Sequence, residues 1–448
     1  MGDNLQGANL LQFLLDSPAD EIKTTLEDIH PADILDALEE YEGDAILLLS
    51  RFPSDVLAAI IEEAEDEDKG EILDLFPHEQ KTEIISEMAS DELVDLLETM
   101  HPDEASELLH ALPEEDAQEV LELMRHDPET AGGIMATEFV AIREQMTVKE
   151  TLEYLQVYGE EAESLSYLYV LDEDGILKGV IALREIVVSP FDEHIGPMIN
   201  TNVISVRADM DQEEVSRIFA KYGFNSIPVV DENDKMLGIV TADDVFYVVE
   251  EETTEDMEKM AALAHSEKDY LDTGVFGLAK QRIFWLLFLM ISATFTGIII
   301  QGYQKELASV VILAAFIPML MDTGGNAGTQ VSTLIIRGMA LGEIKLKDYF
   351  KVLYKELRVS LIVGIVLAAV NFLRVWIFHH DPPLAFTVSA ALLFTVILSK
   401  VVGCTLPMIA QKLKIDPALM ASPIITTIVD ALSLSVYLYL AKTIYINA

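Results

Sequence analysis

The sequence lacks features that several common classes of protein require. Its 448 residues contain a single cysteine, Cys404, which excludes an internal disulfide framework. No Gly-x-Ser-x-Gly turn, Walker-type glycine-rich loop or His-Glu-x-x-His helix occurs, and the nine histidines show no metal-binding spacing. These absences argue against an enzyme, including a membrane-bound enzyme that a nucleotide regulates.

Basic residues are scarce in the first 279 positions, which hold 15 Lys and Arg against 69 Asp and Glu, whereas residues 280–448 hold 14 against 8. Such an acidic region excludes nucleic acid as a partner, because nucleic acid binds a field of opposite sign. Mutual repulsion destabilises a compact fold unless counter-ions screen it, and carboxylate oxygens suit Mg²⁺ and Ca²⁺. Divalent cation binding is therefore favoured, and a merely soluble acidic surface is the alternative.

The N-terminal residues also lack the basic segment and long apolar run of a signal peptide. Apolar runs instead fill the C-terminal part, where five stretches meet the roughly twenty residues needed to cross a bilayer. Basic residues precede the first stretch and occupy the loops between the second and third and between the fourth and fifth. By the positive-inside rule, we predict a multi-pass protein of the cell inner (plasma) membrane with cytoplasmic N-terminal domains. The expected spans are 283–303, 308–340, 349–378, 384–411 and 418–445.

The stretch 317–342 carries polar and small residues within apolar sequence. Pro318 and the glycines at 324 and 325 predict an interruption of the second membrane helix. A break in hydrocarbon leaves backbone groups unpaired, so it is tolerated only inside protein or beside water. Asp322 next to the break is therefore a candidate functional residue, and a structural kink is the alternative.

Asp430 lies about midway along the fifth span. An acid at this depth is costly unless it faces water or a partner, and Lys400 in the fourth span is the nearest basic candidate. A water-filled cation path accounts for Asp430 better than such a pair. Two chains that meet at Asp430 would form a ring of carboxylates of the kind that cation channels use. Mg²⁺ loses its water reluctantly, so we expect it to pass largely hydrated.

Residues 10–130 predict short amphipathic helices. HPADILDAL (30–38), FPSDVLAAI (52–60) and HPDEASELL (101–109) share one pattern: proline, then acids in the first turn, then Leu, Ile or Val at helical spacing. Proline and carboxylates are favourable at a helix N-terminus, and units of this kind stack into a superhelix. Asp91 and Asp95 would lie on one helical face, which is either solvated or shares a cation.

Residues 137–260 contain two copies of one strand–helix–strand–turn–strand–helix unit. The repeat resembles a pair of cystathionine-β-synthase (CBS) domains, modules that commonly bind adenine nucleotides. GIVTADD (238–244) matches the nucleotide motif of that family, whereas GVIALRE (179–185) departs from it, so one intact and one degraded site are expected. A purely structural pair is the alternative. The next segment, 248–285, predicts a long connecting helix that leads to the bilayer.

PMLMDTGGNAGTQ (318–330) and DPALMASPIITTIVD (416–430) resemble the signatures of the MgtE family of magnesium channels and transporters. The resemblance covers nearly the whole chain. It implies an acidic α-helical superhelical domain at 1–135, tandem α/β CBS domains at 136–250, a connecting helix at 251–280 and a five-helix transmembrane pore domain at 281–448. It also implies a homodimeric Mg²⁺ channel whose cytosolic part senses intracellular Mg²⁺.

The same resemblance assigns roles to single residues. Asp430 matches the pore acid of the family. The positions that match regulatory Mg²⁺ ligands are Asp91, Asp95, Gly133, Glu213, Asp244, Glu252 and Glu255. The positions that match ATP contacts are Tyr167, Arg184, Phe224, Thr241 and Asp243. Ser422 and Tyr247 depart from the family pattern, the first where an Asn is common and the second where a sensor acid occurs.

Together these features predict a Mg²⁺-selective channel, an importer of divalent cations. When Mg²⁺ is scarce, cytosolic carboxylates repel one another and favour an open state; when it is abundant, Mg²⁺ bridges them and closes the pore. ATP at the CBS pair would modulate this gating. The alternative is an ion-coupled secondary transporter of Mg²⁺, Co²⁺ or Mn²⁺, which predicts further titratable groups inside the membrane.

Overall fold

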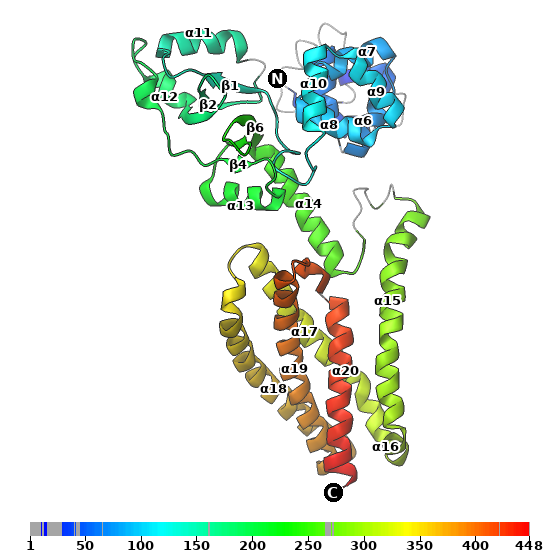
Figure 1. Cartoon of the computed structure of the whole chain (residues 1–448). Coiled ribbons are helices and arrows are strands. Elements are labelled where there is room, and N and C mark those ends of the chain that lie inside the picture. The colour runs from blue at the N-terminus through cyan, green and yellow to red at the C-terminus, as the bar shows by residue number, and fades with distance from the viewer. Residues whose placement is uncertain are drawn as a thin grey trace. The chain divides into compact units, whose positions relative to one another are not determined.

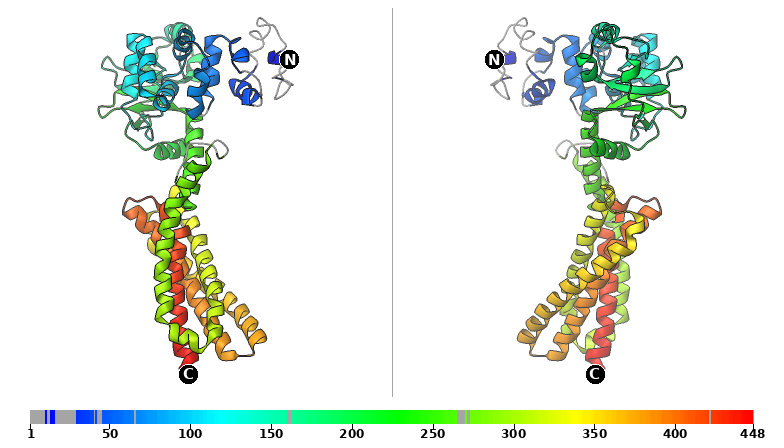
Figure 2. Two further views of the ribbon diagram at one scale, coloured as in Figure 1. Left: turned by 90° about the vertical axis from the view of Figure 1, so that its right-hand side faces the viewer. Right: turned by 90° about the vertical axis from the view of Figure 1, so that its left-hand side faces the viewer.

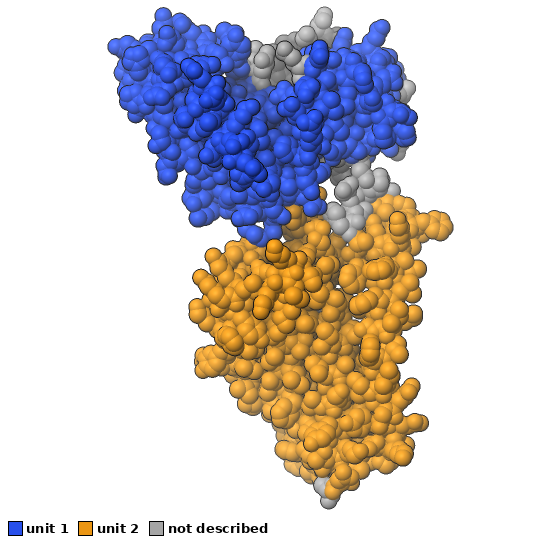
Figure 3. Space-filling view, in the orientation of Figure 1, with its two compact units in different colours: residues 1–250 blue, residues 251–448 orange. Residues whose placement is uncertain are grey.

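The computed structural model describes residues 10, 13–15, 29–39, 41, 45–64, 66–159, 162–264, 270, 273–420 and 422–447. The chain divides into two compact units, residues 1–250 and 251–448, shown in different colours in Figure 3. Figure 1 labels the elements named below. Each unit is described by itself.

Short helices form the first part of unit 1 (Figure 1). Proline opens α3 and α9 and directly precedes α5, α7 and α10, as the repeated pattern predicts. The strongest contacts join helices that are next but one along the chain, namely α3 with α5, α5 with α7, α6 with α8 and α8 with α10, and this packing produces the expected superhelix. The described helices are α3 (Pro31–Glu39), α4 (Ile46–Leu49), α5 (Ser54–Glu62), α6 (Asp66–Leu73), α7 (His78–Ile85), α8 (Ser90–Thr99), α9 (Pro102–Ala111) and α10 (Glu114–Leu123).

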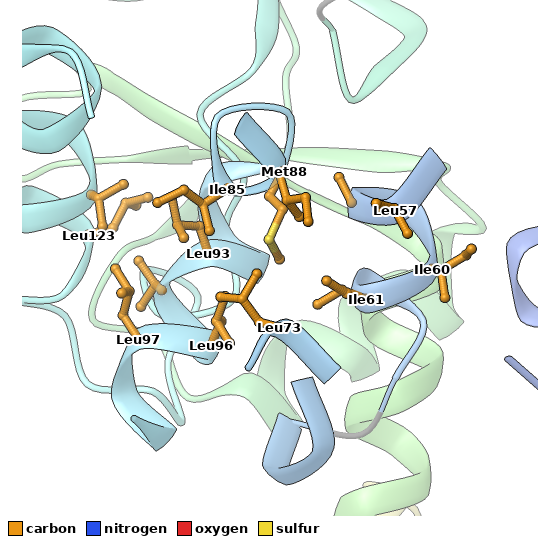
Figure 4. Packing of buried hydrophobic residues seen from close by; sticks show 14 of the residues in the cluster. Leu57, Ile60, Ile61, Leu73, Ile85, Met88, Leu93, Leu96, Leu97 and Leu123 are labelled. Atoms are coloured by element: carbon orange, nitrogen blue, oxygen red, sulfur yellow. The ribbon is translucent and has the colours of Figure 1, made fainter. Parts of the chain in front are cut away.

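Leu and Ile side chains from these helices converge in one buried cluster (Figure 4). Leu57, Ile61, Leu73 and Leu96 are each 0–1 % exposed. Burying a side chain of this size contributes about 1.5–3 kcal/mol relative to leaving it in water. Apolar burial of this kind offsets the repulsion between the many carboxylates on the outer faces.

Two similar small sheets follow, one for each CBS unit. The first contains β1 (Phe139–Ile142), α11 (Val148–Tyr158), β2 (Ser164–Leu171), β3 (Leu177–Ala182) and α12 (Leu183–Val188). The second contains β4 (Val206–Arg207), α13 (Gln212–Tyr222), β5 (Ser226–Val230), β6 (Met236–Thr241) and α14 (Ala242–Met260). In both sheets the first strand pairs parallel with the second, and the second pairs antiparallel with the third. The repeat predicted from sequence is thus confirmed, since both copies fold into the same small sheet with the same strand order.

The connecting helix α14 is shorter than the continuous helix expected over 248–285. Ala262 adopts a left-handed conformation, with φ of 56°, just after the last helical turn. The Ala262 N–H donates to the Lys259 carbonyl and the Leu263 N–H to the Glu258 carbonyl, which is the hydrogen-bond pattern of a Schellman helix end. Helix resumes at Val275 in α15. No glycine marks this end, so the sequence gives no signal of it.

Five segments of unit 2 are long and apolar enough to cross a membrane, as expected. They run over 275–302, 311–340, 346–379, 382–412 and 417–446. The long helices are α15 (Val275–Gly302), α17 (Ile317–Ala340), α18 (Tyr349–His379), α19 (Pro382–Lys412) and α20 (Ser422–Leu440), joined by α16 (Gln304–Ser309) and short 3₁₀ segments, with a π-helical end at Ala441–Ile446. Helices α17, α19 and α20 pack against one another, and α18 packs on α19 (Figure 2).

The predicted break inside the second span is wrong. Helix α17 is continuous from Ile317 to Ala340; Pro318 stands in its first turn, where a missing N–H costs nothing. The glycines serve close packing instead. A Cβ on Gly324 would lie 2.9 Å from Val429, one on Gly328 would lie 2.7 Å from Ile425, and one on Gly403 of α19 would lie 2.4 Å from the Gly328 carbonyl oxygen. Small residues of this kind let membrane helices approach closely.

Candidate ion path and regulatory sites

Helix α17 presents a polar stripe that the described part of the chain leaves exposed. Asp322, Asn326, Gln330, Thr333 and Arg337 are exposed and follow one another at intervals of three or four residues, so they share one helical face. The Asn326 side-chain amide donates to Asp322 Oδ1 at 3.2 Å. A hollow of about 700 Å³ lies along this face, lined by Asn326, Thr329, Gln330, Thr333 and Leu334. In a membrane such a face requires water or another protein surface.

Asp430 of α20 lies at the same level of the bundle as the start of this stripe. Val429 and Ser433, which flank Asp430 along α20, both contact Gly324. The Asp430 side chain is half-buried, and the charge of Asp322 acts on it. The two intramembrane acids singled out in the sequence are therefore brought together, on two helices that pack through glycine.

Lys400 pairs with neither Asp430 nor Asp322 among the ion pairs of the described residues. Its ammonium lies 3.7 Å from Glu356 of α18, and both side chains are largely buried. Lys400 therefore faces α18 rather than the region of Asp430. The pair adds two charged groups to the membrane part of the fold, and the hydropathy of the sequence did not single out Glu356.

The N-terminus of α8 gathers carboxylates in unit 1. Glu62 Oε1 accepts from the Ala89 N–H at 2.8 Å, and Glu138 accepts from the N–H and hydroxyl of Ser90 at 3.1 and 2.8 Å. Asp91 follows in the first turn and is 9 % exposed. The unpaired N–H groups and the dipole of a helix N-terminus favour negative charge there. Local sequence predicts Asp91 in this place, but Glu62 and Glu138 reach it only through the tertiary fold.

More negative charge gathers here than the helix end compensates. Burial, and then Asp244, Glu92 and Glu163, raise the pKa of Asp91 well above its usual range. Burial raises the pKa of Asp244 despite hydrogen bonds from Thr241. Partial burial and the charges of Asp244 and Asp243 raise the pKa of Glu163 to about 7, although part of its side chain stays exposed. Ionised carboxylates are therefore unfavourable in this group, which is the condition that a bound cation relieves.

The other predicted Mg²⁺ ligands lie in different places. Asp95 is half-buried one turn after Asp91 on α8. Gly133 sits in a turn where a Cβ would lie 2.5 Å from the carbonyl oxygens of Asp127 and Pro128, so only glycine fits. Glu213 is in the first turn of α13 and pairs with Arg217.

Glu252 and Glu255 are half-buried on α14, and Glu255 pairs with Lys259. In the part of the chain that the structure describes, no three His, Cys, Asp or Glu side chains converge as a ready metal cage. The carboxylates near Asp91 fit Mg²⁺ by their chemistry, because Mg²⁺ is commonly held by one or two carboxylates and keeps several waters.

Four of the five predicted nucleotide contacts cluster at the CBS pair. Tyr167 and Phe224 meet edge to face with ring centroids 6.5 Å apart. Thr241 pairs across the second sheet with Ser226, two residues after Phe224, and its hydroxyl hydrogen-bonds to Asp243.

Arg184 is exposed on α12, two residues after Ala182, which pairs with Tyr167. The two CBS units are joined by a 3.0 Å hydrogen bond between the Tyr169 and Ser226 hydroxyls. The arrangement offers aromatic faces, a hydroxyl and a carboxylate at one end of the sheets.

Comparison with known proteins identifies each region. Residues 29–129 match the MgtE intracellular N domain, residues 131–190 and 195–251 match the CBS domain, and residues 317–440 match the divalent cation transporter MgtE. The magnesium transporter MgtE of Thermus thermophilus is 36 % identical over 438 residues, which cover 97 % of each chain. The magnesium transporter MgtE of Bacillus subtilis is 38 % identical over 320 residues, covering 71 % of this chain and 70 % of the relative.

Two solved structures of magnesium transport proteins also resemble the cytosolic part of this chain. The cytosolic domain of the Mg²⁺ channel MgtE in complex with ATP is 37 % identical, covers 53 % of this chain and 98 % of that chain, and has a TM-score of 0.50. The soluble part of a magnesium transporter is 32 % identical, covers 55 % of this chain and 97 % of that chain, and has a TM-score of 0.52. The two relatives that align over most of this chain are magnesium transporters, which are membrane transport proteins and not enzymes. The chain belongs to the MgtE family of divalent cation transporters.

Proposed function

We propose that this protein is a Mg²⁺ channel of the plasma membrane, with its acidic N-terminal domains in the cytoplasm. The observation that carries the proposal is the meeting of Asp430 with the polar stripe of α17 inside the apolar bundle. A stripe that one protomer leaves uncovered is suited to line a path between two protomers. Two copies bring two Asp430 and two Asp322 carboxylates to the same level of the membrane.

Hydrated Mg²⁺ is the substrate that this path suits. The amides and hydroxyls of Asn326, Thr329, Gln330 and Thr333 bond to the water around an ion and do not need to replace it. Stripping that water is costly for Mg²⁺, so selection by water-mediated carboxylate contacts is favourable. Asp430 and Asp322 then supply the negative field that draws a divalent cation in and keeps anions out.

Regulation follows from the carboxylates near Asp91. Two unit charges 4 Å apart repel by about 4 kcal/mol at an effective dielectric constant of about 20. Without a cation, this repulsion favours separation of the elements that carry Asp91, Asp244 and Glu163. Mg²⁺ bridges them, and movement of α14, which begins at Ala242 beside this site, then closes the pore. Asp95, Gly133, Glu213 and Glu252 contribute further ligands, whereas Glu255 pairs with Lys259.

ATP is the second ligand that we propose. Tyr167 and Phe224 offer ring faces for adenine, and the Thr241 hydroxyl and the Asp243 carboxylate offer hydrogen-bonding groups for ribose. The support is the geometry of these four residues and the ATP complex of a related cytosolic domain.

Single-channel recording in a reconstituted bilayer tests the pore. We expect unitary Mg²⁺ currents from the parent and from Glu343→Gln, which neutralises an exposed acid, and none from Asp430→Asn although its dimer stays intact. Mg²⁺ flux without unitary currents would instead establish the ion-coupled transporter. Parent-like currents from Asp430→Asn would remove Asp430 from the pore.

A further inference from the structure

The last turn of α14 meets the membrane bundle through a lysine between two acids. Lys259 Nζ lies 2.5 Å from Glu255 Oε1, one turn earlier on the same helix, and 2.8 Å from Asp416 Oδ2. The other oxygen of Asp416 accepts from the Ala418 N–H at 2.8 Å and so fixes the start of the 3₁₀ turn Pro417–Met420. Helix α20, which carries Asp430, begins at Ser422. We call Lys259, Glu255 and Asp416 the Lys259 bridge.

Apolar contacts lie beside the bridge. Met260 packs with Ile336 near the end of α17 and with Ala418, and both of these residues are buried. The end of α14 thus contacts α17, which supplies the polar stripe, and the 3₁₀ turn Pro417–Met420 that precedes α20. The Lys259 ammonium thus bonds to a carboxylate of its own helix and to one that precedes α20.

We propose that Lys259 is a positioning residue, a cation built into the chain that holds α14 against the pore helices without Mg²⁺. An ammonium between two carboxylates supplies the attraction that a divalent ion supplies between two acidic surfaces. Because it is covalently attached, its local concentration does not change with cytosolic Mg²⁺. Glu255 stands at a position that matches a regulatory Mg²⁺ ligand of the family, and in this structure its carboxylate pairs with Lys259. The bridge therefore fixes the end of α14, and the response to Mg²⁺ is left to the carboxylates near Asp91 and the other proposed ligands.

Thiol crosslinking of the full-length protein in the presence of a chelator tests this docking. Met260→Cys and Ala418→Cys on a Cys404→Ser background place one thiol on each side of the contact. We expect a short bifunctional methanethiosulfonate reagent to link them efficiently in the parent. Lys259→Met and Asp416→Asn should each reduce the yield at least fivefold, and the reduction should be no greater when the two are combined.

Controls separate the bridge from general loss of folding. Lys259→Arg keeps a cation and should keep the yield, and the exchange Lys259→Asp with Asp416→Lys should restore it. Lys351→Met removes a lysine that is 84 % exposed and pairs with Asp348, and it should have no effect. Parent-like crosslinking in Lys259→Met, or failure of Lys259→Arg to retain it, would overturn the proposal.

Gating provides a second readout, which rests on the proposed function. If docking of α14 favours closure, Lys259→Met should raise the Mg²⁺ concentration for half-closure in inside-out patches several-fold. Because crosslinking is measured in chelator, it does not depend on Mg²⁺ being the regulator. Reduced crosslinking with unchanged gating would leave the bridge in place and contradict the proposed coupling of α14 to the pore.

Discussion

Replacing Asp91 with asparagine provides a direct test of the carboxylates at the start of α8. Asp91 is almost fully buried, and its ionised form is disfavoured first by burial and then by Asp244, Glu92 and Glu163. Asparagine preserves the shape of the side chain and removes the charge. We therefore expect Asp91→Asn to stabilise unit 1 in chelator and to remove much of the stabilisation that Mg²⁺ provides.

The expected change in the free energy of unfolding is set by two comparisons: the pKa shift of Glu163, and the range measured for mutations of buried polar groups. The rise in the pKa of Glu163 from 4.5 to about 7 corresponds to about 3.4 kcal/mol at 1.36 kcal/mol per unit, which solvent screening of this partly exposed group reduces to on the order of 1 kcal/mol. Asp91 is more deeply buried, so a change of about 1–3 kcal/mol is expected. For a domain of this size, 1 kcal/mol shifts Tm by about 2–4 °C.

The same pKa shifts determine whether the stability of the fold rises or falls with pH. A carboxyl whose pKa is higher in the folded state binds its proton more tightly there, so protonation stabilises the fold. In chelator, the stabilisation contributed by Glu163 is full below about pH 4.5 and is lost as the pH rises through about 7. Mg²⁺ should reverse the trend, because it binds the ionised carboxylates.

Thermal unfolding of the cytosolic fragment 1–270, followed by circular dichroism, is the assay; the corresponding domain of a relative has been crystallised. In chelator near neutral pH, Asp91→Asn should unfold at a higher temperature than the parent and gain less from millimolar Mg²⁺. Asp103→Asn, at a side chain that is 96 % exposed, is the matched control and should behave as the parent does. An Asp91→Asn fragment that unfolds below the parent in chelator would refute the argument.

Three further outcomes are expected. Gly403→Ala places a Cβ 2.4 Å from the Gly328 carbonyl oxygen and should destabilise the detergent-solubilised protein by about 1–3 kcal/mol or more. Gly297→Ala is the control and should not destabilise it, because no described atom lies within 4 Å of the added Cβ. Equal thermal stabilities of the two variants would contradict the packing. Phe224→Ala should weaken ATP binding to the cytosolic fragment at least tenfold by calorimetry, and an unchanged affinity would exclude stacking on this ring. Glu163→Gln should flatten the fall in stability in chelator between about pH 5 and 7, and an unaltered pH profile would show that Glu163 is not its source.

The domain order and the membrane spans were predictable because hydropathy, charge and repeat pattern act over many residues at once. The role of Gly324 and Gly325 was not, because a glycine pair in an apolar run is consistent both with a break and with close packing. Only the positions of Val429 and Ser433 on α20 decide between them. The end of α14 was likewise hidden, since alanine at 262 carries no signal for a left-handed residue.

The regulatory site was predictable in part. Asp91 stands in a recognisable first helical turn, and the family resemblance marked Asp244. Glu138 and Glu163 lie 47 and 72 positions from Asp91 in the chain, and only the tertiary fold brings their charges near it. Lys259 belongs to a helix whose i, i+4 pair with Glu255 is ordinary, and its second partner, Asp416, lies beyond four membrane spans.

The glycine contacts between α17, α19 and α20 have a consequence for how the protein responds to salt. Backbone packed against backbone is held by dispersion, which ionic strength does not weaken, whereas attraction between exposed charges falls within a Debye length of about 8 Å in physiological salt. Changes in electrolyte that loosen the acidic cytosolic domains should therefore leave the helix pairs at Gly324, Gly328 and Gly403 intact. A preparation stripped of divalent ions would keep its membrane bundle assembled, and its recovery on adding Mg²⁺ would be a rearrangement of folded parts rather than refolding.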